Sequence, residues 1–217
     1  MSYAEIEALA EVNNLLILGG FHPETKEHLP DWCETLLLFG PKPDFWTAFS
    51  ASPERLDQQP DAMDRWSLRV LGEMATRVNG AALFPFGGAP FLPFFSWALK
   101  SGHAWQSPVN LLVHSEAGLM VSYRGALALR EKLALPPAPA KPCDSCDQPC
   151  LTACIPRALT AGGYDVPACK AHLTSEKGRE NMELGCSVRR ACPVSQSYAR
   201  MSEQNAFHMR SFMGENR

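Results

Sequence analysis

The chain has 217 residues, of which 46% are hydrophobic and 20% charged, and its formal net charge is −3. This composition predicts a globular protein of one compact domain, or of one domain and a small appendage. The charge gives no general basis for nucleic-acid binding, and no apolar run reaches the roughly 20 residues that a membrane-spanning helix needs.

The first 135 residues predict a mixture of helices and strands. Apolar residues recur at helical spacing from Met63 to Val78, and Asp61 is placed to cap that helix. We also expect helices over residues 4–12 and 91–100, and strands over 15–18, 36–39, 81–86, 109–114 and 119–123. The last two strands are expected to pair through a turn at Ala117 and Gly118. Together these elements predict an α/β or α+β layered domain.

A proline-rich connector follows, because residues 136–142 contain four prolines in seven positions. Such a segment cannot form a regular helix and favours an extended, semi-rigid conformation. We therefore expect three parts: an α/β domain over residues 1–135, a connector over 136–142, and a small helical and loop module over 143–217.

Seven of the eight cysteines fall in that last module, and the first four form the run CDSCDQPCLTAC. Steps of three or four residues allow successive thiolates to converge on one inorganic core, and a later Cys-Pro, here at Cys192, can add a ligand from a distant turn. This spacing favours a [4Fe–4S] cluster and an electron-transfer protein. The candidate metal ligands are Cys143, Cys146, Cys150, Cys154, Cys169, Cys186 and Cys192.

The sequence gives less support to other roles for these cysteines. A disulfide scaffold suits short secreted chains, whereas this N-terminus has acidic residues where a signal peptide would be basic, so we expect a cytoplasmic protein. Zinc modules usually pair two short C-x2-C knuckles across a gap, which differs from one run of four cysteines, although structural zinc stays an alternative. Cys33 stands apart and is expected to be a packed thiol.

The order of these cysteines resembles the ferredoxin-type module of epoxyqueuosine reductases and their reductive-dehalogenase relatives. Residues 87–90 and 110–125 are similar to the segment that forms part of the cobalamin-binding core in that family. The resemblance implies a flavin-reductase-like domain before the iron–sulfur module. His114, on the strand-like run before Ser115, could approach a cofactor, whereas a lone histidine on an apolar stretch is more often hydrogen-bonded in the core. The resemblance also implies a redox partner protein or small-molecule cofactor as partner, with cobalamin among the candidate cofactors.

In the two-cluster topology of such modules, the last cysteine of each run serves the opposite cluster. The resemblance therefore implies a first set with a full ligand count and a second set that is one thiolate short. The first set comprises Cys143, Cys146, Cys150 and Cys192, and the second set comprises Cys154, Cys169 and Cys186. The second could hold a cluster completed by His172, Asn181 or an outside ligand, a three-iron cluster, or nothing.

The chain departs from the family where the reductases carry an acidic residue presumed to protonate the substrate, because Gly87 stands there. A missing proton donor typically lowers the reaction rate by 10² to 10⁴. We therefore expect an electron-transfer protein in preference to an epoxide reductase. The chain also ends soon after the module, so a tRNA substrate is not expected. A small cobalamin-dependent reductase and a non-catalytic metal-stabilised interaction module remain as alternatives.

Overall fold

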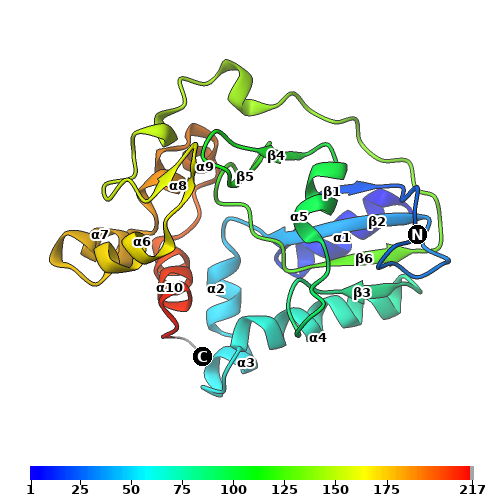
Figure 1. The fold of residues 1–217 in the computed structure, drawn as a ribbon. Coiled ribbons are helices and arrows are strands. Elements are labelled where there is room, and N and C mark those ends of the chain that lie inside the picture. Colours follow the sequence, from blue (N-terminus) through cyan, green and yellow to red (C-terminus); the bar gives the residue numbers. More distant parts are fainter. Residues whose placement is uncertain (216–217) are drawn as a thin grey trace. The chain divides into compact units, whose positions relative to one another are not determined.

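The computed structural model describes residues 1–215, and the chain folds into two compact units (Figure 1). Unit 1 comprises Met1–His103 and Ser122–Pro139, and unit 2 comprises Ala104–Val121 and the described residues from Ala140 onward. The chain leaves unit 1 inside the predicted connector. Residues 104–121, which we expected in the first domain, group with the cysteine-rich part instead. The mixed helix and strand content confirms the predicted α/β class.

Unit 1 is built on one antiparallel sheet with the strand order β1-β2-β6-β3. Its strands are β1 (Leu15–Phe21), β2 (Thr35–Pro41), β3 (Ala81–Leu83) and β6 (Gly125–Leu129). Every residue of β2 is buried because the strand lies between β1 and β6 and has a covered surface on both faces. The continuous apolar run in β2 is therefore explained by its central position. Strand β6 was not predicted.

The helices of unit 1 are α1 (Tyr3–Val12), α2 (Phe45–Ser50), α3 (Pro53–Leu56), α4 (Ala62–Arg77) and α5 (Phe94–Lys100). Helix α1 begins with a capping box between Ser2 and Glu5. Helix α4 packs against β3 and β6 with its predicted apolar face, including Trp66 and Met74, buried. Asp61 stands at its N-cap position, but with a left-handed backbone and no side-chain cap bond.

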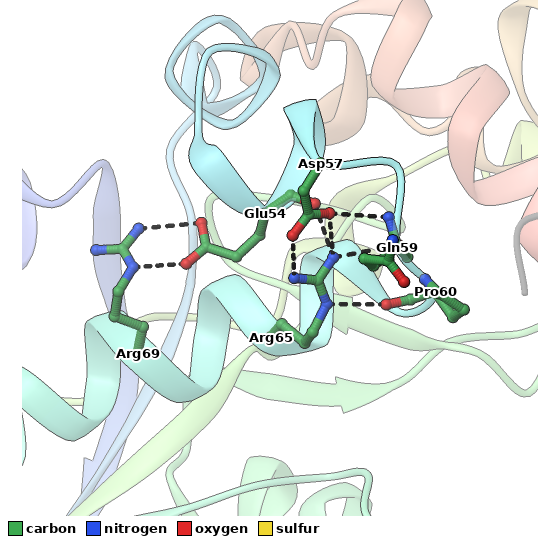
Figure 2. A network of polar contacts seen from close by, with 6 residues as sticks. All are labelled: Glu54, Asp57, Gln59, Pro60, Arg65 and Arg69. Carbon is green, nitrogen blue, oxygen red and sulfur yellow. Dashed lines mark hydrogen bonds and ion pairs between the residues drawn. The ribbon is translucent and has the colours of Figure 1, made fainter.

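Two arginines of α4 bind α3 and the loop after it (Figure 2). Arg69 donates two hydrogen bonds to the carboxylate of Glu54, at 2.6 and 3.2 Å. Arg65 donates to both carboxylate oxygens of Asp57 at 2.7 Å and to the carbonyl of Pro60 at 2.9 Å. The Pro60 carbonyl lies just before α4 and accepts a hydrogen bond from Arg65. Arg65 therefore fixes the start of the helix, where the side chain of Asp61 makes no capping bond.

Unit 2 consists of short elements joined by loops. Its strands are β4 (Ala104–Gln106), β5 (Leu112–His114), β7 (Leu159–Thr160) and β8 (Gly163–Tyr164), and its 3₁₀ turns are η1 (Pro142–Ser145), η2 (Pro149–Leu151) and η3 (Glu176–Gly178). Its helices are α6 (Val166–Leu173), α7 (Arg179–Leu184), α8 (Ser187–Ala191), α9 (Pro193–Tyr198) and α10 (Ser202–Met213). This matches the predicted helical and loop character of the cysteine region.

The predicted strand pairing in residues 109–123 is wrong. Only Leu112–His114 forms a strand, its strand partner is β4, and the expected pairing across the turn is reduced to one antiparallel bridge between His114 and Gly118. Three backbone groups that a strand over 119–123 would have used are bound by side chains: Leu119 N–H donates to Oγ of Ser195, and the carbonyls of Leu119 and Met120 accept from Arg189 and Arg200. Tertiary hydrogen bonds therefore replace the ladder.

No helix within residues 1–215 has both the length and the apolar character needed to cross a bilayer.

Candidate metal centre

The four cysteines of the first set line one small cavity. Its walls also contain Val113, Leu119, Pro149 and Pro193. Val113 and Leu119 belong to the hydrophobic core of unit 2, to which Cys150 and Cys192 also belong. The thiols thus meet in a site with apolar walls, which limits water access to any group bound there.

Short proline-initiated turns place the first three thiols of this set. Cys143 lies in η1, Cys146 ends that turn, and Cys150 lies in η2, and both turns begin at a proline. Between them Gln148 adopts a left-handed backbone conformation and its N–H donates to Sγ of Cys146 at 3.3 Å. These two turns, with the left-handed residue between them, place the three thiols along one cavity.

Cys192 reaches the same cavity from a segment more than 40 positions further along the chain. It stands between α8 and α9, where Pro193 starts the second of these helices. Helix α8 packs against η2, so the end of α8 lies next to Cys150. The predicted contribution of a distant Cys-Pro to the first set agrees with this arrangement.

The thiols of the first set act on one another electrostatically. Burial raises the pKa of Cys143 and Cys150, and Cys192 and Cys146 raise both further. Cys150 and Cys192 are buried, whereas Cys143 and Cys146 are half-buried. Neighbouring thiols become stable thiolates when a cation or a cationic metal core neutralises them.

The second set also comes together, with only three cysteines. Cys154 and Cys186 both raise the pKa of Cys169, after the larger effect of burial. Two hydrogen bonds position these residues: Leu159 N–H donates to Sγ of Cys154 at 3.3 Å, and Oγ of Ser187, the neighbour of Cys186, donates to the carbonyl of Ala153 at 2.7 Å. All three thiols are half-buried.

Both sets contain a sulfur that accepts a backbone hydrogen bond, Cys146 from Gln148 and Cys154 from Leu159. An amide that donates to sulfur stabilises the thiolate form and, in iron–sulfur proteins, shifts the reduction potential of the cluster. These amides are therefore oriented as a bound anionic cluster requires.

Two half-buried arginines, Arg189 and Arg200, lie in this part of unit 2, and Arg189 is close to Cys186 of the second set. The pKa of Arg189 is lowered by burial, and Cys186 and Tyr164 oppose that effect. Burial, with a contribution from Arg189, lowers the pKa of Arg200 to about 9. Neither guanidinium forms an ion pair with a carboxylate of the described residues. Partial removal of a cation from water without an anionic partner is unfavourable, so the surroundings of Arg189 favour an anionic group at the neighbouring thiols.

His114 does not lie in this cavity lining. Its imidazole is buried, with 1% of its surface exposed, and Nδ1 accepts hydrogen bonds from the backbone N–H groups of Glu116 and Ala117 at 3.1 and 3.3 Å. Because Nδ1 is an acceptor, the proton of the neutral ring resides on Nε2. The side chain shapes the turn after β5, while its predicted role toward a cofactor stays a prediction.

The non-cysteine ligands considered for the second set are His172 and Asn181. Nε2 of His172 and Oδ1 of Asn181 are buried and have no hydrogen-bond partner among the described residues. The groups that act on the Cys169 thiol are instead Tyr164, Cys186 and Cys154. Tyr164 was missed at the sequence level, because nothing in the spacing of the cysteines includes it.

All eight thiols are free, including the buried Cys33, whose Sγ donates to the carbonyl of Thr35 at 3.4 Å. Within residues 1–215, no group of three or more His, Cys, Asp or Glu side chains is arranged to hold a metal ion.

Comparisons of the chain with protein-family models, with curated proteins and with solved structures gave no match.

Proposed function

We propose that this chain is an iron–sulfur redox protein that transfers single electrons through a [4Fe–4S] cluster bound by the first set. The observation that carries the proposal is the convergence of Cys143, Cys146, Cys150 and Cys192 on one cavity with apolar walls. Four thiolates match the ligand count of such a cluster. When bound, the cluster would supply a one-electron donor and acceptor, and the chain would hold it and limit its contact with water.

The position of Cys143 supports an exchange of electrons with a partner. Cys143 also lines a polar hollow together with Gln106, Lys141, Asp144 and Gln148. One edge of the first set is therefore accessible from the surface, while Cys150 and Cys192 are buried. A redox partner protein or a small-molecule cofactor that docks in this hollow would lie next to a cluster ligand.

As part of this proposal, we assign unit 1 as a flavin-reductase-like layered domain. The support is its four-stranded antiparallel sheet, against which α1, α4 and α5 pack. A cobalamin-dependent reductase is the second function that the sequence resemblance implies, and the preparation described next tests it too.

The test is anaerobic purification and reconstitution, followed by quantitation of iron, sulfide, zinc and cobalt and by electron paramagnetic resonance. We expect iron and sulfide in equal amounts and a reduced-cluster signal. Cys143→Ala and Cys192→Ala should each lose the iron of the first set. Cys33→Ala, which removes a buried thiol elsewhere, is the matched control and should retain it.

The proposal is wrong if Cys143→Ala and Cys192→Ala both keep full iron and sulfide and an unchanged spectrum. Zinc in place of iron would instead support the metal-stabilised interaction module. Spectral change on titration with cob(II)alamin would support the reductase, and no change at high micromolar concentration would leave the electron carrier.

A further inference from the structure

Ser107 lies in the wall between the cysteine cavity of the first set and the polar hollow beside it. Ser107, Cys143 and Gln148 line both spaces. Only 5% of the surface of Ser107 is exposed, and its Oγ is buried without a hydrogen-bond partner among residues 1–215. We infer that this hydroxyl donates a hydrogen bond to sulfur when the first set holds its cluster, and so raises the reduction potential of that cluster. The inference rests on the proposed function and deepens it.

The backbone fixes Ser107 at this wall. It follows β4, and its N–H donates to the carbonyl of Leu111 at 2.8 Å while its carbonyl accepts from the N–H of Asn110 at 3.0 Å. Asn110 has a left-handed backbone, and its side chain accepts a hydrogen bond from Nε2 of Gln106 at 2.7 Å. Both backbone groups of Ser107 are therefore used within the turn between β4 and β5, and the turn does not need the hydroxyl.

The chemistry of the cavity favours a sulfur acceptor for this hydroxyl. Within the described residues, its lining consists of the four cysteines, Ser107, Gln148 and apolar side chains such as Val113 and Leu119. A buried hydroxyl without a partner is unfavourable. Neutral thiols are only weak acceptors, whereas metal-bound thiolates and inorganic sulfide carry negative charge and no proton, so they accept strongly. The hydroxyl of Ser107 therefore gains its partner when the cluster binds.

The effect on the reduction potential follows from the charge of the cluster. Reduction adds one electron, so the sulfur atoms become more negative and a hydrogen bond to them becomes stronger. The donor therefore stabilises the reduced cluster more than the oxidised one, which raises the potential. The N–H of Gln148, which donates to Sγ of Cys146, acts in the same sense. The proton stays on the serine oxygen throughout, so no group titrates.

The test compares Ser107→Ala and Ser107→Thr in the reconstituted full chain, by potentiometric titration followed by electron paramagnetic resonance. Ser107→Ala should lower the one-electron equilibrium constant for reduction about threefold to tenfold, where tenfold corresponds to about 59 mV. Ser107→Thr keeps a hydroxyl and should stay close to the original potential. Because Oγ of Ser107 has no partner among the described residues, the alanine variant removes no bond from the folded chain and should fold normally.

Ser115→Ala is the matched control. Oγ of Ser115 is also buried without a partner among the described residues, but Ser115 lines neither of the two spaces. Its removal should leave the potential unchanged. A second measurement is pulsed electron–nuclear double resonance of the reduced cluster in H₂O and in D₂O. The original chain and Ser115→Ala should show an exchangeable proton coupled to the cluster that is absent in Ser107→Ala.

The inference is overturned, and the proposed function left intact, if Ser107→Ala and Ser115→Ala hold iron at the first set with the same potential and the same exchangeable couplings. An equal shift in Ser107→Ala and Ser107→Thr would also overturn it, because the shape of the wall and not the hydroxyl would then be responsible. Loss of iron in Ser107→Ala alone would support the bond. A chain that binds no iron, or keeps all of it in both Cys143→Ala and Cys192→Ala, would overturn the proposed function and this inference together.

Discussion

The N–H of Leu119 donates a hydrogen bond of 2.9 Å to Oγ of Ser195, a residue 76 positions further along the chain. The contact is close because Gly118 has a φ of +54° and a Cβ there would lie 2.5 Å from the backbone nitrogen of Ser195. Ser195 follows Cys192 by three residues on α9. This bond therefore attaches the segment over 104–121 to the element that carries the last ligand of the first set.

Ser195→Ala should destabilise unit 2 by about 1–3 kcal/mol, because it leaves the buried N–H of Leu119 without its acceptor. Chemical denaturation measures the free energy of unfolding, and hydrogen exchange at the Leu119 amide should accelerate. Ser197→Ala is the matched control, since Ser197 is an exposed residue of the same helix whose hydroxyl donates to the carbonyl of Pro193. Its effect should stay within about 0.5 kcal/mol. Equal effects of the two changes would show that the Ser195 bond contributes nothing.

We predict that Arg189→Met makes the reduction potential of a cluster bound by the second set more negative, because it removes a half-buried cation beside Cys186. A shift of about 59 mV corresponds to a tenfold change in a one-electron equilibrium. We expect a shift of that order, with lower iron retention, in a potentiometric titration followed by electron paramagnetic resonance.

Arg190→Met is the control for this prediction. Arg190 lies on the same helix, but it pairs with the exposed carboxylate of Glu180 at 2.7 Å and donates to the carbonyl of Gly185. Its removal should leave the potential unchanged. An equal shift in both variants would mean that only the net charge of the chain matters.

The parts of the fold that depend on local periodicity were predictable. Helix α4 follows from apolar residues at helical spacing, and β2 from an uninterrupted apolar run. Strand β6 was missed because its sequence, GALAL, has small residues and no β-branched side chain, so only its place between β2 and β3 makes it a strand. The strand expected after Gly118 failed because Ser195, Arg189 and Arg200 bind its backbone groups, which no local pattern encodes.

In the candidate site, too, features with a local sequence pattern were predictable and those that depend on tertiary contacts were not. The family resemblance implied the division of the cysteines into two sets, and the cysteine spacing predicted that several thiolates converge, because consecutive ligands in loops leave a regular trace in sequence. Tyr164 left none, since its contacts are to Cys169 in the next helix and to Phe212 at the end of the described chain. The ligand roles themselves remain predictions that metal analysis must test.

Glu54→Gln should destabilise unit 1 by about 1 kcal/mol at neutral pH, because it replaces a largely buried carboxylate that accepts two hydrogen bonds from Arg69 (Figure 2). Glu73→Gln is the control: its carboxylate lies 3.8 Å from the same arginine but is exposed, so its change should cost less than about 0.5 kcal/mol. Urea denaturation of both variants measures the difference, and indistinguishable variants would contradict the role assigned to Glu54.

The same carboxylate predicts a pH dependence. Its hydrogen bonds from Arg69 hold the pKa of Glu54 below the ordinary value of 4.5. The unfolded chain therefore takes up a proton first as pH falls, so the stabilisation is complete above about pH 5 and is lost as pH falls through the lower folded pKa. The difference between the original chain and Glu54→Gln should shrink over that acidic range. A constant difference would mean that Glu54 acts through shape and not charge.

Gly72→Ala should stabilise the protein by about 0.5–1 kcal/mol. Gly72 lies in the interior of α4 with an ordinary helical backbone, and a Cβ there would meet nothing within 4 Å. Alanine reduces the conformational freedom of the unfolded chain and has the higher helix propensity. Gly80→Ala is the contrasting change, because its Cβ would lie 2.5 Å from the carbonyl oxygen of Ala128. It should destabilise the β3–β6 pair, and the two variants should move the midpoint of thermal unfolding in opposite directions. A lower midpoint for Gly72→Ala would mean that the surface of α4 at this position is covered in the folded protein.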